Sequence, residues 1–162
     1  MSEDPLLREV REEDFSIFFE QQDDPVARHM VAFATESTHD REAYFAHWRD
    51  VVLADETGVK RTLVWEGQVA GYLVCFHRGG RQQVGYYLGR DYWGRGLATR
   101  GLREMLTLIE ERPLYGCVAA DNEGSRRVLE KCGFVLIGEE QAFARSRGET
   151  IRELILRLDA TG

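Results

Sequence analysis

Tyr86-Tyr87-Leu88-Gly89-Arg90-Asp91-Tyr92-Trp93-Gly94-Arg95-Gly96-Leu97-Ala98 is the stretch of sequence that decides the fold. It has the pattern of an apolar strand end, a short polar turn, and two glycines immediately before a helix. Apolar residues then recur with helical spacing; they are Leu97, Leu102, Met105, Leu106 and Ile109. The first N–H groups of a helix lack intrahelical partners, and glycines without a Cβ let a bulky anion approach them. The stretch therefore predicts a phosphate-binding turn.

The composition indicates one soluble globular domain over residues 1–162. Hydrophobic residues make up 43% of the chain and charged residues 30%, which is ordinary for a folded domain of this length. The formal net charge of −7 argues against a general nucleic-acid binder, which needs a basic excess to pair with phosphates. Basic residues do cluster around the predicted turn, including Arg90, Arg95, Arg100 and Arg103. A local basic patch on an acidic chain favours a small anionic ligand.

The cysteines and the N-terminus predict a cytoplasmic location. Cys75, Cys117 and Cys132 are odd in number and lack C-x-x-C spacing, so buried free thiols are expected in a reducing compartment. The first residues are acidic and contain no apolar signal-peptide core. No apolar run approaches the roughly 18 residues that span a bilayer, so no membrane association is expected.

Hydrophobic periodicity predicts an α+β domain without repeats or linkers. Strands are expected at 6–10, 59–65, 68–76, 82–88, 114–120, 134–137 and 150–158, with an extension of the sixth strand to 144 left open. Turns are expected at Glu66-Gly67 and at 77–80. Helices are expected after the acidic segment 11–14, from about 39 to 54 with Thr38 as N-cap, and from the glycine turn to Glu111. A last helix is expected at 123–131, with Asn122 as N-cap and Gly133 as the residue that ends it. A dinucleotide-binding fold is excluded by this order, and Thr99 stands where its third glycine would be.

Two motifs resemble the GNAT superfamily of acyl-coenzyme A N-acyltransferases, and in particular its branch of ribosomal-protein N-terminal acetyltransferases. The first is Tyr92-Trp93-Gly94-Arg95-Gly96-Leu97-Ala98-Thr99, which is similar to the coenzyme A signature of that branch. The second, about thirty residues on, is Asn122-Glu123-Gly124-Ser125-Arg126-Arg127-Val128-Leu129-Glu130-Lys131-Cys132-Gly133-Phe134. The resemblance implies a mixed, mostly antiparallel sheet of about seven strands, splayed after the fourth and flanked by about four helices.

The resemblance also implies acetyl-CoA as the acyl donor, with CoA as product. No metal is expected, because no cluster of His, Cys and Asp residues has ligand spacing. The turn and first helical residues would hold its pyrophosphate; they are Gly94, Arg95, Gly96, Leu97, Ala98 and Thr99. The main chain of Tyr86, Tyr87 and Leu88 would pair with the pantetheine arm, and a backbone N–H near Leu88 would stabilise the oxyanion. Asn122, Ser125 and Arg127 in the second motif are further expected cofactor contacts.

The proton-transfer groups follow the family pattern only in part. Ser125 is the expected acid for the departing thiolate, because Leu129 stands where many members have a tyrosine. A thiolate with a pKa near 8.5–9 needs little help to leave. Gln83 occupies the place where the family often has an acidic residue, and glutamine cannot accept a proton. The base is therefore left open among water and four side chains, which are Glu36, His39, Glu139 and Glu140.

The expected reaction is direct transfer of acetyl to a primary amine in a ternary complex. The acceptor is a small molecule or peptide, or else a protein N-terminus as the branch suggests. A non-catalytic coenzyme A-binding or sensory module is the alternative, since Gln83 and Leu129 depart from the common pattern. The C-terminal segment at 153–157 also departs from the branch, so the acceptor cannot be carried over. Dimers occur in the family, and a homodimer is left open.

Overall fold

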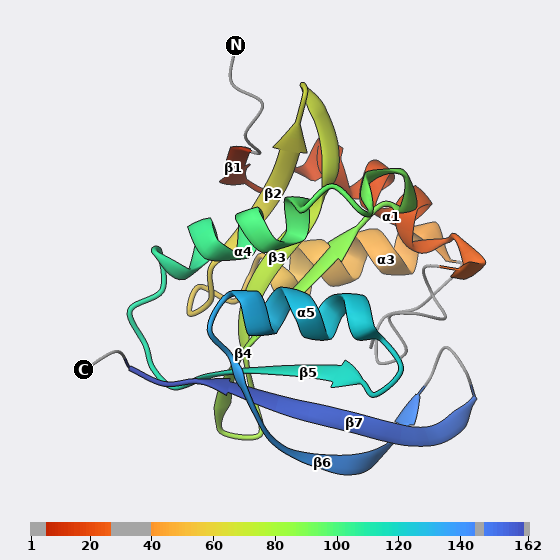
Figure 1. Cartoon of the computed structure of the whole chain (residues 1–162). Coiled ribbons are helices and arrows are strands. Elements are labelled where there is room, and N and C mark those ends of the chain that lie inside the picture. The colour runs from red at the N-terminus through yellow and green to blue at the C-terminus, as the bar shows by residue number, and fades with distance from the viewer. Residues whose placement is uncertain (1–5, 27–39, 145–147, 161–162) are drawn as a thin grey trace.

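The computed structural model describes residues 6–26, 40–144 and 148–160 of the chain (Figure 1). The strands are β1 Leu6–Glu9, β2 Lys60–Trp65, β3 Gln68–Arg78, β4 Arg81–Leu88, β5 Leu114–Ala119, β6 Val135–Ala144 and β7 Glu149–Leu158. The α-helices are α1 Phe15–Gln22, α3 Arg41–His47, α4 Leu97–Leu106 and α5 Glu123–Lys131. Shorter helical turns are η1 Glu12–Asp14, the π-helical η2 Trp48–Val52, and η3 Arg90–Tyr92.

All seven strands belong to one sheet with the order β1-β2-β3-β4-β5-β7-β6. Every neighbouring pair is antiparallel except β4 and β5, which are parallel and paired at a single register position, Gln83 with Tyr115. In Figure 1 the two strands diverge widely beyond this point. The predicted mixed sheet with a splay after the fourth strand is therefore confirmed.

Two hydrophobic clusters cover the two faces of the sheet. The larger one includes Leu97, Leu102 and Met105 of α4 and Leu129 of α5, packed on the central strands. The second contains Phe15, Phe18, Tyr44 and Trp48, packed on β3. Helices α4 and α5 thus lie on one face and α1 and α3 on the other, as Figure 1 shows. The three cysteines are free thiols, and Cys75 is buried in the larger cluster.

Local turn chemistry explains most of the boundaries. The two-residue β2–β3 turn at Glu66-Gly67 has φ values of 51° and 77°, as expected for a tight hairpin. Gly79 and Gly80 alone form the β3–β4 turn, because β3 continues through His77 and Arg78, which were expected in that turn. Asn122 caps α5, and Gly133 follows this helix with a φ of 97°, both as predicted.

Two helix predictions need correction. The helix expected from about residue 39 begins at Arg41, because the Asp40 carboxylate accepts hydrogen bonds from the N–H groups of Glu42 and Ala43. Thr38, the predicted cap, lies outside the described residues. Helix α4 ends at Leu106 rather than at Glu111: the Thr107 hydroxyl donates to the Glu104 carbonyl at 2.7 Å.

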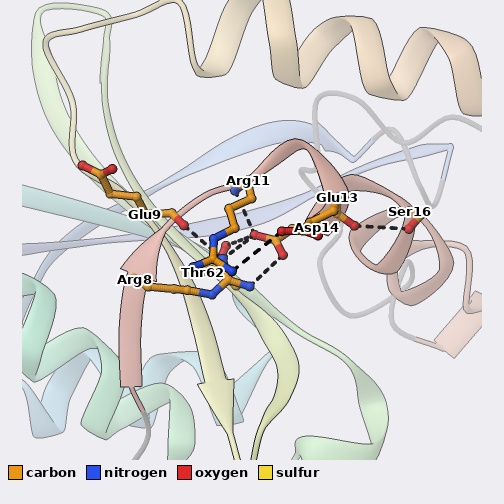
Figure 2. A network of polar contacts seen from close by, with 7 residues as sticks. All are labelled: Arg8, Glu9, Arg11, Glu13, Asp14, Ser16 and Thr62. Atoms are coloured by element: carbon orange, nitrogen blue, oxygen red, sulfur yellow. Dashed lines mark hydrogen bonds and ion pairs between the residues drawn. The ribbon is translucent and has the colours of Figure 1, made fainter.

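A buried carboxylate fixes the start of α1 against the sheet (Figure 2). Asp14, which is 1% exposed, accepts two hydrogen bonds of 2.8 Å from the Arg8 guanidinium on β1. It also accepts from the Arg11 N–H at 2.9 Å and from the Thr62 hydroxyl on β2 at 2.7 Å. Burial opposes ionisation, yet the hydrogen bonds from Arg8, Arg11 and Thr62 lower the pKa of Asp14 below its usual value. Asp14 is thus a fully bonded anion that ties α1 to β1 and β2.

Candidate functional site

The gap between β4 and β5 exposes main-chain groups at the end of β4. The Gly89 N–H donates to the Ala70 carbonyl on β3 at 2.9 Å, so the peptide groups of Gly89 face β3. Successive residues of an antiparallel strand direct their N–H and C=O groups to opposite sides. The N–H groups of Tyr86 and Leu88 therefore face the gap. Both residues follow Gln83, the only residue of β4 that pairs with β5. Two donors on one strand suit an extended, amide-bearing ligand.

The glycine turn leads directly from this strand into α4. Gly94 and Gly96 both have a φ of 75°, a conformation that strongly favours glycine, and a Cβ added at either would meet no atom within 4 Å. Gly96 is the N-cap of α4, and no side chain caps the helix. The first-turn residues Leu97, Ala98 and Thr99 follow with their N–H groups at the positive end of the helix dipole. The turn is an open, uncapped helix N-terminus of the predicted kind.

Aromatic side chains hold the turn in place. The indole N–H of Trp93 donates to the Leu88 carbonyl at 3.0 Å, which ties the turn to the end of β4. The Arg95 guanidinium lies over the Trp65 ring, 4.9 Å from its centroid. Arg95 is nevertheless exposed, with its charge beside the open turn. Trp93 and Trp65 are thus structural supports of the turn.

The N-terminus of α5 meets β4 on the same side of the gap. The Asn122 side-chain carbonyl accepts from the Ser125 N–H at 3.2 Å, which caps the helix. The Tyr86 hydroxyl donates to the Ser125 carbonyl at 3.2 Å, and burial raises the pKa of this tyrosine to about 12. The structure therefore brings Tyr86 and Ser125 together. Arg127 instead lies on the exposed side of α5, with its guanidinium 3.8 Å from the Glu123 carboxylate.

The residues at the two family positions for acid–base groups, and the candidate bases, lie in different surroundings. Gln83 is 9% exposed and lies within the sheet, while Leu129 is a core residue with 1% exposure. Glu139 is paired with Arg152 at the surface. Glu36 and His39 lie outside the described residues. Neither of the two family positions for an acid–base group therefore carries an ionisable side chain.

Sequence reasoning missed one carboxyl group, that of Glu153 on β7. It pairs in register with Ala119 on β5 and with Glu140 on β6, and it is 4% exposed. Burial, together with the neighbouring Glu140 carboxyl, raises the pKa of Glu153 to about 6. The alternating pattern of β7 indicates a solvent-facing side chain here, and no local signal reveals that this face is covered. Glu153 is thus a buried carboxyl group with a raised pKa.

A cavity of about 430 Å³ lies on the opposite face of β4, between this strand, β3 and the α3–η2 segment. Gly85, Tyr86 and Tyr87 form part of its wall, and aromatic residues form much of the rest. Among residues 6–26, 40–144 and 148–160, no group of three or more metal-ligating side chains occurs. Within the same ranges, no helix has the length and apolar character needed to cross a membrane.

Two curated relatives match part of the chain. The protein named "Putative ribosomal N-acetyltransferase YdaF" from Bacillus subtilis (strain 168) is 28% identical over 107 residues, which are 61% of this chain and 57% of that protein. The protein named "Uncharacterized N-acetyltransferase p20" from Bacillus licheniformis is 25% identical over 85 residues, or 50% of this chain and 48% of its own length. The chain thus spans about half the length of these relatives.

Solved structures show the same fold at low sequence identity. RimL, a ribosomal L7/L12 alpha-N-protein acetyltransferase in complex with coenzyme A, superposes with a TM-score of 0.80 at 16% identity, covering 99% of this chain and 97% of RimL. The microcin C7 self-immunity acetyltransferase MccE, in complex with acetyl-CoA and AMP, gives a TM-score of 0.80 at 14% identity, covering 98% and 94%. These likenesses establish the fold.

The family is established by sequence. The acetyltransferase (GNAT) domain model matches residues 6–135, which include the glycine turn, the diverging strand β4 and helix α5. The resemblance read from the two motifs is therefore confirmed at the level of the family, and this chain belongs to the GNAT acetyltransferases.

Proposed function

We propose that this protein transfers an acetyl group from acetyl-CoA to a primary amine, by direct attack in a ternary complex. The proposal is based on the arrangement at the end of β4. This strand pairs with β5 at one register position only, and the chain then continues into an open glycine turn at the N-terminus of α4. The gap offers main-chain donors and the turn offers an anion site. Their succession along one strand matches a ligand that joins a pyrophosphate to an amide-bearing arm.

The residues present fit acetyl-CoA. Gly94 and Gly96 leave open space at the turn, and side chains at these positions would project into it. Arg95 supplies a positive charge beside the turn, and Asn122 and Ser125 border the gap from α5. When bound, acetyl-CoA supplies a thioester whose acetyl carbonyl is open to attack by an amine. Arg127, which faces Glu123 at the helix surface, would reach the ligand only after leaving that ion pair.

The chain contributes positioning and hydrogen bonds to the reaction. The N–H groups of Tyr86 and Leu88 would pair with the bound arm, and one of them would donate to the carbonyl oxygen as negative charge develops there. Ser125 remains the proposed proton donor to the sulfur, and its support is that the Tyr86 hydroxyl donates to the Ser125 carbonyl, so this residue is close to β4. The amine loses its proton to water or to a carboxylate on the acceptor side, because Gln83 cannot accept it.

A non-catalytic coenzyme A-binding module is the second candidate. Its specific support is that Gln83 and Leu129 are both buried and non-ionisable at the two positions where the family often has an acid–base group. Such a protein would bind acetyl-CoA and leave it intact in the presence of every amine.

Calorimetric titration of acetyl-CoA into wild-type protein and the Gly96→Glu variant tests the proposal. The glutamate adds a side chain and a negative charge at the pyrophosphate position, so binding should be lost. Gly80→Glu is the matched control, because Gly80 has a φ of 77°, close to the 75° of Gly96, also has open space around it, and lies at the other end of β4. It carries the same backbone strain and the same charge.

Loss of binding in Gly96→Glu alone would support the site. Equal binding by wild type and both variants would overturn the placement of the pyrophosphate, and no binding by the wild type would overturn the function. A thiol-release assay over an amine library then separates the two candidates: release with any amine supports the enzyme, and binding without release supports the module.

A further inference from the structure

The cavity between β3, β4 and the α3–η2 segment is built on the same part of β4 as the gap. Gly85, Tyr86 and Tyr87 contribute to its wall, while the N–H of Tyr86 faces the gap at the edge of the same strand. A molecule seated in the cavity therefore approaches β4 beside the place where the proposed acyl donor pairs with it. At about 430 Å³, the cavity lies within the usual range for small-molecule sites, roughly 300–1,000 Å³.

Aromatic rings form the inner wall of this cavity. Trp48 and Tyr72 meet edge to face with ring centroids 4.8 Å apart, and Tyr72 stacks on Tyr87 at 6.1 Å with an interplanar angle of 13°. Phe76 and Val74 extend the apolar wall along β3. These contacts fix the rings in place, so the wall is a preformed apolar surface.

Tyr44 contributes a buried phenol to the lining of the cavity. The hydroxyl of Tyr44, a residue that is 4% exposed, makes no hydrogen bond of ordinary geometry to the described residues. Buried hydroxyl groups are nearly always satisfied, because leaving one unpaired is unfavourable. Burial also raises the pKa of Tyr44 to about 12, so the group is a neutral phenol at physiological pH. The phenol therefore adds no charge to the apolar wall.

The charges near the cavity are of both signs. Asp55 contributes a carboxylate, while Lys60 and Arg78 contribute cations. His47 and His77 are the remaining titratable imidazoles of the lining. Among the described lining residues, this set offers a polycation, such as a polyamine or an aminoglycoside, one carboxylate beside two cations.

We infer that the acetyl acceptor is a monoamine whose neighbouring group is apolar and of aromatic size, and that this group binds in the cavity between α3–η2 and β4. The inference rests on the proposed function and names the substrate class for that site. Two sources share this chemistry: a free arylalkylamine, and a peptide whose first residue has a large apolar side chain. An apolar wall also lowers the pKa of an amine beside it, which favours the neutral nucleophile.

A matched set of amines tests the inference. Phenethylamine and a tripeptide with N-terminal Phe represent the two sources, and ethylamine, a tripeptide with N-terminal Ser, and spermidine lack the apolar group or carry several charges. Binding to CoA-loaded protein is measured by calorimetry, and turnover by thiol release. The apolar members should bind at least about tenfold more tightly than their small or polar counterparts. The source is identified by which of the two apolar compounds turns over.

Two variants localise the effect. Gly85→Ala places a methyl group in the cavity wall, where its nearest neighbours, Phe76 at 3.4 Å and Val74 at 3.6 Å, are at ordinary contact distance. Val51→Asp adds a charge to an exposed lining residue, so neither change removes a core contact. Each should weaken binding of the apolar amines about tenfold and leave acetyl-CoA affinity unchanged.

Matched controls lie on the distant strand β6. Gly138→Ala adds a methyl group in open space, and Val135→Asp adds a charge at an exposed valine outside the cavity lining. Neither should alter amine binding. If acetyl-CoA binds but spermidine or the Ser peptide is preferred, or if the cavity variants behave like their controls, the inference is overturned while the proposed function stands. Absence of acetyl-CoA binding overturns the proposed function itself.

Discussion

The indole N–H of Trp93 donates a hydrogen bond of 3.0 Å to the carbonyl oxygen of Leu88. This bond joins the last residue of β4 to the residue that precedes the first glycine of the turn. Because it occupies the Leu88 carbonyl on the side facing the gap, a ligand there can pair with the N–H groups of Tyr86 and Leu88 and with the Tyr86 carbonyl. The tryptophan thus determines both the position of the turn and the acceptors that the strand offers.

Replacing Trp93 with Phe should loosen this connection while keeping an aromatic ring. Loss of one hydrogen bond should lower the free energy of unfolding by about 1 kcal/mol. If the glycine turn is held in its binding conformation less firmly by about the same free energy, acetyl-CoA should bind about fivefold more weakly. Urea denaturation and calorimetric titration measure the two effects. Unchanged binding in a destabilised variant would show that the bond serves the fold alone.

Replacing Asp14 with Asn should destabilise the protein strongly. The change removes a buried anion that pairs with Arg8 and also accepts from Arg11 and Thr62, so we expect a loss of about 3 kcal/mol. The pKa of Asp14 is lower in the folded protein than its value near 3.8 in the unfolded chain. Its contribution to the free energy of unfolding is therefore present above pH 3.8 and is lost as the pH falls through the folded pKa. Denaturation curves from pH 2 to 7 should show an acid-dependent loss in the wild type, diminished in the variant. If the free energies of unfolding of the wild type and the variant differed by the same amount at every pH, this role of Asp14 would be contradicted.

Replacing Glu153 with Gln should stabilise the protein at neutral pH. A pKa raised from 4.5 to about 6 means that the folded state binds the proton more tightly than the unfolded state. This stability is fully present below pH 4.5 and is lost as pH rises through 6, by about 2 kcal/mol in total. The glutamine variant should lack this pH dependence. Glu139→Gln is the control, since Glu139 is exposed and paired with Arg152, and it should retain the wild-type slope between pH 4.5 and 6.

Replacing Ser125 with Ala tests the proposed proton donor. If the hydroxyl protonates the sulfur, kcat should fall about 100-fold with the KM for acetyl-CoA little changed. The N-terminal cap of α5 should survive, because Asn122 accepts from the main-chain N–H of residue 125. Steady-state thiol release measures both constants. A kcat within about threefold of the wild type would assign the proton to water.

Features that depend on local chemistry could be predicted from the sequence. Asn122 as the cap of α5, Gly133 after it, and the tight turn at Glu66-Gly67 follow from side-chain and backbone preferences that act within a few residues. The pattern of residues 86–98 predicts the glycine turn, and the motif resemblance predicts the divergence of β4 from β5. The turn is open and the strands pair once, as expected.

Features that depend on distant packing could not be predicted. Ile109 is buried as its spacing suggested, but in a turn beyond the end of α4, so periodicity extended that helix too far. Glu153 sits at a polar position of an alternating strand, yet neighbouring strands and Glu140 cover it. The contact between Tyr86 and Ser125 joins residues 39 positions apart, which no local pattern encodes.

The single pairing of Gln83 with Tyr115 has a mechanical consequence. The sheet has two parts, β1 to β4 and β5 to β7. They are joined where β4 pairs with β5 and diverge beyond that pairing, as Figure 1 shows. A ligand that binds both β4 and β5 across the gap would restrict motion of the two parts of the sheet relative to each other. Amide exchange should therefore slow on binding along the facing edges of β4 and β5, while the outer strands β1 and β6 keep their rates.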